Sequence, residues 1–232
     1  MPGRLAIYDD ISFKKDAIDI FGNIKDNIKV LNKRYNIAPT IDIPILLNNF
    51  VYTYAHFGFV PSWAKDTKTI NINARSESIF EKKTFRESYK SKRAIVPING
   101  SYEWIKNPYK KESIPYIIKH SKQDYLALAA IWDEWYDTST NTYLLNCALL
   151  TTEPNDKIKQ IHDRMPVVLD KKDWALWLDN STNFEQLNKL FKPYPNERIK
   201  IEEVSTLVNS VRNDSIKCIS KQNVKIGQGS LF

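Results

Sequence analysis

The sequence predicts an α+β fold built on a curved antiparallel β-sheet or a barrel-like core. Short segments rich in β-branched and aromatic residues recur along the chain, with turn residues between them. Segments with helical spacing are fewer and shorter, which suggests helices added between strands at the periphery. Hydrophobic residues make up 42% of the 232 residues, and no Gly/Ser-rich or Pro-rich linker interrupts them, so we expect a single folded domain.

Each predicted element follows from a local pattern. After an apolar run that starts at Leu5, strands are expected at residues 45–60, 94–98, 114–119, 125–131, 143–151 and 167–170. Helices are expected at residues 76–89, 172–178 and 183–191, where apolar residues lie three and four apart. Ser76 is placed to cap the first of these helices. The segment 215–232 is polar, so we expect a domain at residues 1–214 and a mobile tail after it.

Charge and composition narrow the class of partner. The net charge of +7 and the isoelectric point of about 9.2 indicate an anionic partner, with nucleic acid as the first candidate. A composition rich in lysine and isoleucine can also reflect genome bias. There is no run of about 18 apolar residues and no signal-peptide pattern, so we expect neither a membrane span nor secretion. Two cysteines, Cys147 and Cys218, fit a reducing cytoplasm and are too few for a cysteine-built zinc site.

The N-terminus offers a candidate nucleophile. Methionine before a small second residue is commonly removed, which would leave Pro2 with a free secondary amine. An ordinary α-amine titrates at roughly 7.7–8.0, so a useful fraction is neutral near pH 7. Neutral amines attack aldehydes and form Schiff bases. Any protein can begin with Met-Pro, so Pro2 is a credible nucleophile only if the rest of the sequence supports that role.

Four polar residues lie in three short stretches that adjoin predicted strands or helices. Asn73 can donate and accept hydrogen bonds, and Arg75 offers a fork suited to phosphate, although both also fit an ordinary helix start. Glu103 lies between two aromatic residues, where an apolar setting would raise the pKa of its carboxyl and suit it to proton transfer. His162 has the strongest polar context of the three histidines, because His56 and His120 fall in strand patterns.

Aromatic and proline-rich stretches suggest contact with bases. The segment 57–64 carries Trp63, and the segment 35–40 carries Pro39. Exposed Trp and Pro near basic residues can stack on bases or wedge between them, while core packing of an aromatic-rich strand is the alternative.

Taken in order, these stretches resemble the SRAP (SOS response-associated peptidase) family. The resemblance rests on eight ordered matches that reach Asp214, namely MPGR, YNIAPT, FGFVPSWA, NARSES, INGSYEW, LTTEPN, IHDRMPVVL and VSTLVNSVRND. It implies a compact α+β domain around a strongly bent β-sheet with peripheral helices. It also implies a protein that captures abasic sites in single-stranded DNA, with a preference for single-strand/double-strand junctions.

The resemblance assigns roles residue by residue. The family carries a cysteine at the second position, whose amine and thiol close a thiazolidine ring on the sugar aldehyde. Asn73 is implied to position the N-terminal residue and the sugar, and Glu103 and His162 to transfer protons. Arg4, Arg75 and Arg164 are implied to hold phosphates. The segments with Pro39, Trp63 and Thr151 are implied to shape the DNA channel, and the same site is implied to remove the chain's leading residues.

Pro2 departs from that pattern, because it has no thiol and cannot form a thiazolidine. We expect a reversible iminium and lyase chemistry instead. Pro2 as an engineered substitution, a non-catalytic DNA binder that shields lesions, and a self-processing peptidase are the alternatives. The chemistry needs no metal or other cofactor, and no metal-ligand spacing is found. We expect a monomer in the cytoplasm, associated with the nucleoid.

The end of the chain carries a second, weaker motif. Gln228, Leu231 and Phe232 resemble the short peptide with which bacterial repair proteins bind the replication sliding clamp. Gly229 stands where leucine is usual, and a tail without a partner is the alternative.

Overall fold

The fold is built on a large sheet that closes into a small barrel. The computed structural model describes residues 2–106 and 113–221. In spatial order the large sheet contains β12 (Met165–Pro166), β11 (Thr142–Thr152), β10 (Leu126–Asp137), β7 (Arg93–Ile98), β4 (Asp42–Leu47), β5 (Val51–Phe57) and β2 (Lys25–Asp26). β5 pairs with β11 as well as with β4, which closes the ring, and β6 (Asn73–Arg75) pairs with β11 beyond β5.

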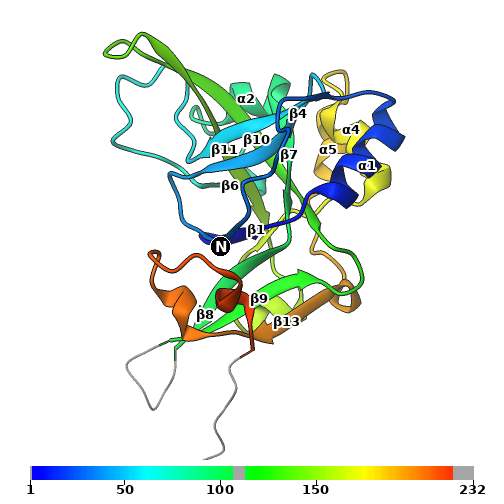
Figure 1. The fold of residues 1–232 in the computed structure, drawn as a ribbon. Helices are drawn as coiled ribbons and strands as arrows, with labels where there is room; N and C mark the ends of the chain where they lie inside the picture. Colours follow the sequence, from blue (N-terminus) through cyan, green and yellow to red (C-terminus); the bar gives the residue numbers. More distant parts are fainter. Residues whose placement is uncertain (1, 107–112, 222–232) are drawn as a thin grey trace, which may run out of the picture.

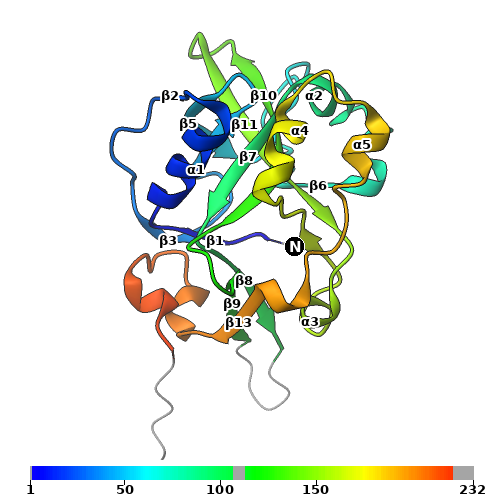
Figure 2. The same ribbon diagram turned by 90° about the vertical axis from the view of Figure 1, so that its right-hand side faces the viewer.

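A second sheet of five strands lies below the barrel, where β8, β9 and β13 are seen in Figure 1. Its order is β13 (Ile199–Glu203), β9 (Ile114–His120), β8 (Gly100–Ile105), β1 (Leu5–Ile7) and β3 (Arg34–Ile37). In both ribbon views the N-terminal end of the chain lies between the barrel and this sheet (Figures 1 and 2). The N-terminal residues are therefore held at the junction of the two layers.

Short helices cover the outside of the barrel (Figure 2). The α-helices are α1 (Ile11–Phe21), α2 (Arg86–Ser91), α3 (Asp156–Lys159), α4 (Trp174–Leu178) and α5 (Phe184–Asn188). Five 3₁₀ helices complete the described elements: η1 (Ser76–Ser78), η2 (Lys171–Asp173), η3 (Asn196–Arg198), η4 (Thr206–Asn209) and η5 (Ile216–Ile219). Within the described ranges, no helix has the length and apolar character that a membrane crossing would need.

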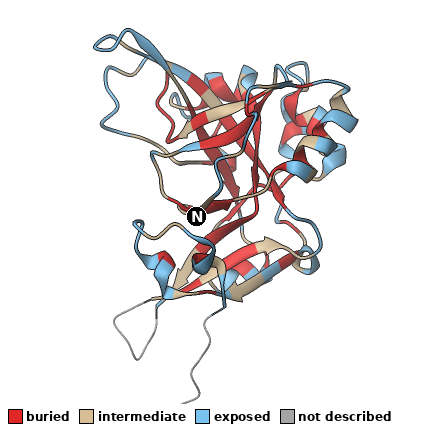
Figure 3. Ribbon diagram, viewed as in Figure 1, coloured by how far each residue is buried: buried red, intermediate tan, exposed pale blue. Residues whose placement is uncertain are grey.

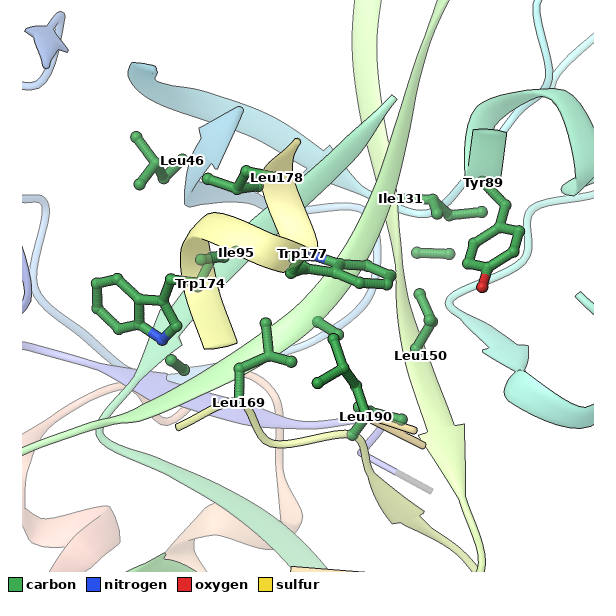
Figure 4. Packing of buried hydrophobic residues seen from close by; sticks show 14 of the residues in the cluster. Leu46, Tyr89, Ile95, Ile131, Leu150, Leu169, Trp174, Trp177, Leu178 and Leu190 are labelled. Atoms are coloured by element: carbon green, nitrogen blue, oxygen red, sulfur yellow. The ribbon is translucent and has the colours of Figure 1, made fainter. Parts of the chain in front are cut away.

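The strands of the barrel alternate between two apolar clusters. On β7, Ala94, Val96 and Ile98 face the barrel interior, whereas Ile95 faces the helices. Figure 4 shows the helix-side cluster, in which Trp174 and Trp177 of α4 pack over the sheet. Colouring by burial shows the strands largely buried and the helices exposed on their outer faces (Figure 3). Both faces of the barrel wall are thus covered, so its backbone is a rigid support for the loops and for β6.

The predicted fold class is confirmed, and several predicted boundaries need correction. The predicted strand 45–60 is two strands, β4 and β5, joined by a turn in which Phe50 has a φ of 59°. The predicted helix 76–89 consists of η1, a run of turns and α2, and the residue before η1 is Arg75, without a side-chain cap from Ser76. The predicted strand 167–170 makes a single bridge, Val168 to Leu128. Three strand pairs, β11–β5, β11–β6 and β2–β5, are parallel, so the sheet is only mostly antiparallel.

The packed part of the chain continues beyond Asp214, where the sequence suggested that the domain ends. Residues 216–219 form η5, and Cys218 is fully buried against the small sheet. Its thiol lies 3.5 Å from the carbonyl oxygen of Asn213. Residues 215–221 therefore belong to the folded body. Gln228, Leu231 and Phe232, the predicted clamp-binding residues, lie outside the described residues, and that motif stays a prediction.

Candidate functional site

Pairing between β1 and β8 fixes the surroundings of the N-terminal residues. Leu5 lies opposite Ser101 in the antiparallel ladder, and the amide of Tyr102 donates to the carbonyl of Arg4 at 2.9 Å. Pro2 is buried, and Gly3 is half-buried. Because the two strands are antiparallel, Glu103, the next residue of β8, lies beside the residues that precede Arg4. The predicted nucleophile and the predicted acid are thus brought to the same junction of the two sheets.

Glu103 has the electrostatic character that its sequence context predicts. Burial raises the pKa of its carboxyl, while His162 acts in the opposite direction. That opposing contribution means that His162 lies within electrostatic reach of Glu103. A half-buried carboxyl with a raised pKa is suited to donating a proton to a reacting oxygen.

The Nδ1 of His162 has two neighbours. The backbone N–H of Arg164 lies 3.0 Å from Nδ1 and can donate to it. A carboxylate oxygen of Asp163 lies 2.8 Å from the same Nδ1 and accepts from it when that nitrogen carries a proton, in the imidazolium or in the neutral Nδ1–H tautomer. One nitrogen cannot do both at once, so the position of the ring proton decides which of the two contacts is a hydrogen bond.

Asn73 presents an amide with unused hydrogen-bonding capacity. It is the first residue of β6 and lies opposite Leu149 of β11. Both its Nδ2 and its Oδ1 are buried, and neither has a hydrogen-bond partner among the described residues. Buried amides are almost always paired, so such a group indicates a ligand or an ordered water that completes it.

Unpaired buried side-chain atoms concentrate at the predicted site. The described part of the chain contains six of them, and four belong to Arg4, Asn73 and Arg164. The other two are the hydroxyl of Tyr89 and the indole nitrogen of Trp174, which lie in the helix-side core. Leaving a buried donor or acceptor unpaired costs about 1–3 kcal/mol, so this concentration indicates selection for something other than stability.

The three predicted phosphate-binding arginines differ in how they are held. Arg75 is exposed. Arg4 donates from Nη1 to the side chain of Asn36 at 2.8 Å and to the carbonyl of Val208 at 3.1 Å. Arg164 is 13% exposed and is engaged by Glu77. Only Arg75 of the three is thus presented to solvent in the manner that its predicted role requires.

The sequence pattern of the family described as SOS response associated peptidase (SRAP) matches residues 1–211. The chain belongs to the SRAP family. The match includes all the predicted catalytic residues and all the predicted DNA-contact residues. The clamp-like end of the chain lies beyond it.

Two SRAP relatives and one solved structure are similar to this chain over most of its length. Abasic site processing protein YoaM of Bacillus subtilis (strain 168) is 36% identical over 232 residues, covering 96% of this chain and 99% of YoaM. Abasic site processing protein YoqW of the same strain is 37% identical over 191 residues, covering 80% of this chain and 84% of YoqW. A crystal structure of a Bacteroides thetaiotaomicron protein superposes with a TM-score of 0.83 at 24% identity, covering 94% of this chain and 99% of that one. At this identity, the superposition shows a shared fold.

The SRAP segment with Trp63 lies at the surface on a braced loop. The Trp63 side chain is 55% exposed, and the ammonium of Lys83 lies 5.1 Å from its ring centroid. On one side of Trp63, the amide of Ser62 donates to Asp133 of β10 at 2.8 Å. On the other side, the indole of Trp135 donates to the carbonyl of Ala64 at 2.8 Å. Two anchors on one strand thus hold the loop backbone on either side of this exposed indole.

Two other predicted channel residues are less exposed. Pro39 follows β3 and is half-buried. Thr151 is fully buried, and its carbonyl accepts from Arg164 at 2.8 Å. Thr151 therefore lies beneath the surface, and its carbonyl helps to hold Arg164. The predicted DNA contacts of both residues stay predictions.

Neither cysteine replaces the thiol that Pro2 lacks. Cys147 and Cys218 are both fully buried and unpaired. Burial raises the pKa of the Cys147 thiol to about 12, so a thiolate is disfavoured near neutral pH. Within the described ranges, no group of histidine, cysteine and carboxylate side chains is arranged to hold a metal ion.

Two site residues were not predicted, although both lie inside SRAP motifs. Asn36 of YNIAPT accepts from Arg4 and donates to the carbonyls of Ser210 and Asn213 at 2.9 and 2.7 Å. Glu77 of NARSES binds Arg164 through both oxygens. In the sequence, the only sign that these two residues belong to the site was their position: each is a polar residue inside a matched motif, and no role had been assigned to it.

Proposed function

We propose that this chain processes abasic sites in single-stranded DNA through the amine of Pro2. The observation that carries the proposal is the set of unpaired buried polar atoms on Arg4, Asn73 and Arg164, in a structure where Pro2 is also buried. A sugar with hydroxyl, aldehyde and phosphate oxygens could pair these groups. The names of YoaM and YoqW, both abasic site processing proteins, support the same substrate.

The proposed chemistry needs an amine, an acid and a base. The nitrogen of Pro2 adds to the C1′ aldehyde of the ring-opened sugar. The carbonyl oxygen then leaves as water, taking the amine proton and one proton from Glu103, and an iminium remains. A base such as His162 can remove a C2′ proton, so that the C3′–O bond breaks and the 3′ phosphate departs with the electron pair. Water hydrolyses the iminium and frees the protein.

DNA would approach over the surface that carries the exposed Arg75 and Trp63. Arg75 offers a fork to phosphate, and the braced indole offers a face to a base. The net charge of +7 favours the approach of a polyanion. We include in the proposal a preference for single-strand/double-strand junctions, a monomeric state and a cytoplasmic location.

The test is reductive trapping on single-stranded DNA that contains one abasic site. Intact mass first confirms that Met1 is removed. The wild type is expected to form an adduct only when borohydride is present, because hydride reduces an iminium to a stable amine. Pro2→Cys, a matched variant with a thiol, should form an adduct without borohydride. Pro2→Glu, which favours retention of Met1, should form none. Tight DNA binding without any adduct from the wild type would contradict the proposed chemistry.

Glu103→Gln is expected to change the pH dependence of trapping as well as its rate. Because the pKa of Glu103 is raised, its acid form persists above the usual carboxyl range and is lost as the pH rises through that pKa. The amine of Pro2 becomes reactive as pH rises, so the wild type should show a bell-shaped profile. The variant should lose the falling limb and react about 100-fold more slowly.

Single-turnover trapping across the pH range measures this prediction. Glu134→Gln is the matched control, because Glu134 lies exposed on β10. Its profile should equal that of the wild type. A falling limb that persists in Glu103→Gln would assign the acid to another group.

A further inference from the structure

Trp63 lies in a tight turn that is closed by its own backbone. The amide of Ala64 donates to the carbonyl of Pro61 at 2.8 Å, so residues 61–64 form a β-turn with Trp63 at its third position. Val60 and Pro61 are buried, whereas Ser62 and Trp63 are exposed. The turn fixes these residues relative to one another, and contacts with the rest of the protein must hold it in place.

Side chains from one face of the β10–β11 pair make those contacts. Asp133 and Trp135 lie two residues apart on β10 and therefore share a face, and Asn146 of β11 lies opposite Asp133 in the antiparallel ladder. The amide of Ser62 donates to Oδ2 of Asp133 at 2.8 Å, and the amide of Val60 donates to Oδ1 of Asn146 at 2.9 Å. The indole of Trp135 donates to the carbonyl of the turn's last residue at 2.8 Å.

Asp133 is the charged member of this set. Its side chain is 6% exposed, and its Oδ1 accepts from Nζ of Lys92 at 2.6 Å and from the amide of Glu134 at 2.9 Å. The other oxygen, Oδ2, accepts from Ser62. A hydrogen bond from an amide to a carboxylate is stronger than one between neutral groups. Asp133 therefore anchors the turn more firmly than a neutral acceptor would, and Lys92 compensates its buried charge.

We infer that Asp133 is a positioning residue, which holds the turn 61–64 so that the Trp63 indole is presented to DNA. The inference rests on the proposed function, in which this indole meets a base. Asp133 is buried and acts through the backbone of the turn, without contact to DNA of its own. A ring on a backbone that is already held loses less freedom when DNA binds, so the brace adds to DNA affinity.

Two substitutions at Ser62 isolate the contact. Ser62→Pro removes the N–H that Asp133 accepts. It keeps the turn, because Ser62 has a negative φ and proline is favoured at the second position of a β-turn. Ser62→Ala is the matched control, because it removes the exposed hydroxyl and keeps the N–H.

The first arm of the test needs no DNA and measures hydrogen exchange at the amide of Ala64, which closes the turn. Loss of a hydrogen bond to a charged group should speed this exchange about tenfold in Ser62→Pro. Ser62→Ala should match the wild type. The amide of Ala129, which donates to the carbonyl of Val167 at 2.9 Å, should exchange equally in all three proteins and so report an intact barrel. Unchanged or slower exchange at Ala64 in Ser62→Pro overturns the inference.

The second arm measures affinity for single-stranded DNA that carries a tetrahydrofuran analogue of the abasic site, which has no aldehyde to react. Trp63→Ala should weaken binding by roughly 5- to 140-fold, the effect of losing one base stack. Ser62→Pro should weaken it by a part of that factor, about tenfold. In the Trp63→Ala background Ser62→Pro should have no further effect. An equal effect of Ser62→Pro in both backgrounds, or no effect of Trp63→Ala, overturns the inference.

Trapping on the reactive abasic site separates the inference from the function on which it rests. At saturating DNA, Ser62→Pro should trap as fast as the wild type, because the turn contributes to binding and not to the chemistry at Pro2. A slower saturated rate with unchanged affinity overturns the inference. If the wild type fails to trap but both arms give the expected results, the chemistry proposed for Pro2 is contradicted, and the positioning role of Asp133 is supported.

Discussion

Asn73→Leu is expected to stabilise the protein and to slow abasic-site capture at the same time. Both polar atoms of Asn73 are buried and have no partner among the described residues, so the folded protein bears the cost of burying them. Leucine has a similar shape and no polar atoms, and it should raise the free energy of unfolding by about 1 kcal/mol. Loss of a preorganised hydrogen-bonding group should slow capture about 100-fold. Denaturant unfolding and single-turnover trapping measure the two effects.

Asn99 is the matched control for this prediction. It is also buried, but its Oδ1 accepts from the amides of Tyr8 and Asp9, and its Nδ2 donates to the carbonyls of Asp9 and Asp124. Asn99→Leu should therefore destabilise the protein, by about 3 kcal/mol, because it leaves several buried groups unpaired. If the two variants were destabilised equally, the amide of Asn73 would be satisfied in solution, and its proposed role in binding the sugar would lose its basis.

Arg93→Met is expected to produce the largest loss of stability. Arg93 is 1% exposed and donates to four main-chain carbonyls, those of Tyr89, Lys90, Trp177 and Asp179, at 2.6–2.7 Å. These carbonyls lie at the C-terminal ends of α2 and α4, where a cation is favourable. Methionine fills similar space but leaves the carbonyls without donors. The cost should be about 3–5 kcal/mol, which corresponds to a fall in Tm of roughly 10 °C for a chain of this size.

Thermal and denaturant unfolding check this value against a matched variant. Arg86 is the first residue of α2, its side chain is 47% exposed, and it pairs with Glu87. Arg86→Met should change stability by no more than about 0.5 kcal/mol. A small effect at Arg93 as well would mean that the two helices do not depend on the buried guanidinium for their attachment to β7.

A strand could be predicted from sequence where its own residues, and not contacts with distant segments, show that it is buried. The segments at β7, β9 and β11 carry β-branched residues between turns, and each was expected at nearly its observed position. The predicted strand 125–131 covers only the first half of β10, which continues to Asp137. Helix α1 was not predicted, although aspartate, the residue type before it, is favoured at helix starts. The residue before it, Asp10, turns its carboxylate inward to Tyr52 and Lys14 and does not cap the helix. The contact of Asp10 with Tyr52, which lies 42 residues away, draws its carboxylate from the helix start, and no local sequence pattern shows this contact.

The site was predictable where chemistry depends on residue type and neighbours. Glu103 between aromatics correctly indicated a carboxyl with a raised pKa. The partner of Arg164 was not predictable, because Glu77 lies 87 residues away and meets it only when β6 and β12 pair with β11. An arginine alone in sequence suggests a phosphate, whereas an arginine in a fold can already be engaged by a carboxylate.

Arg4 contacts a residue that the ribosome adds to the chain 204 positions later. Its guanidinium contacts Asn36 and the carbonyl of Val208, and Asn36 in turn holds the carbonyls of Val208, Ser210 and Asn213. During synthesis the N-terminal amine emerges first, long before those residues leave the exit tunnel. The surroundings that would activate Pro2 therefore assemble only after residues 208–213 have been synthesised. A nascent chain that has not reached these residues would carry the amine without the contacts proposed to support its chemistry.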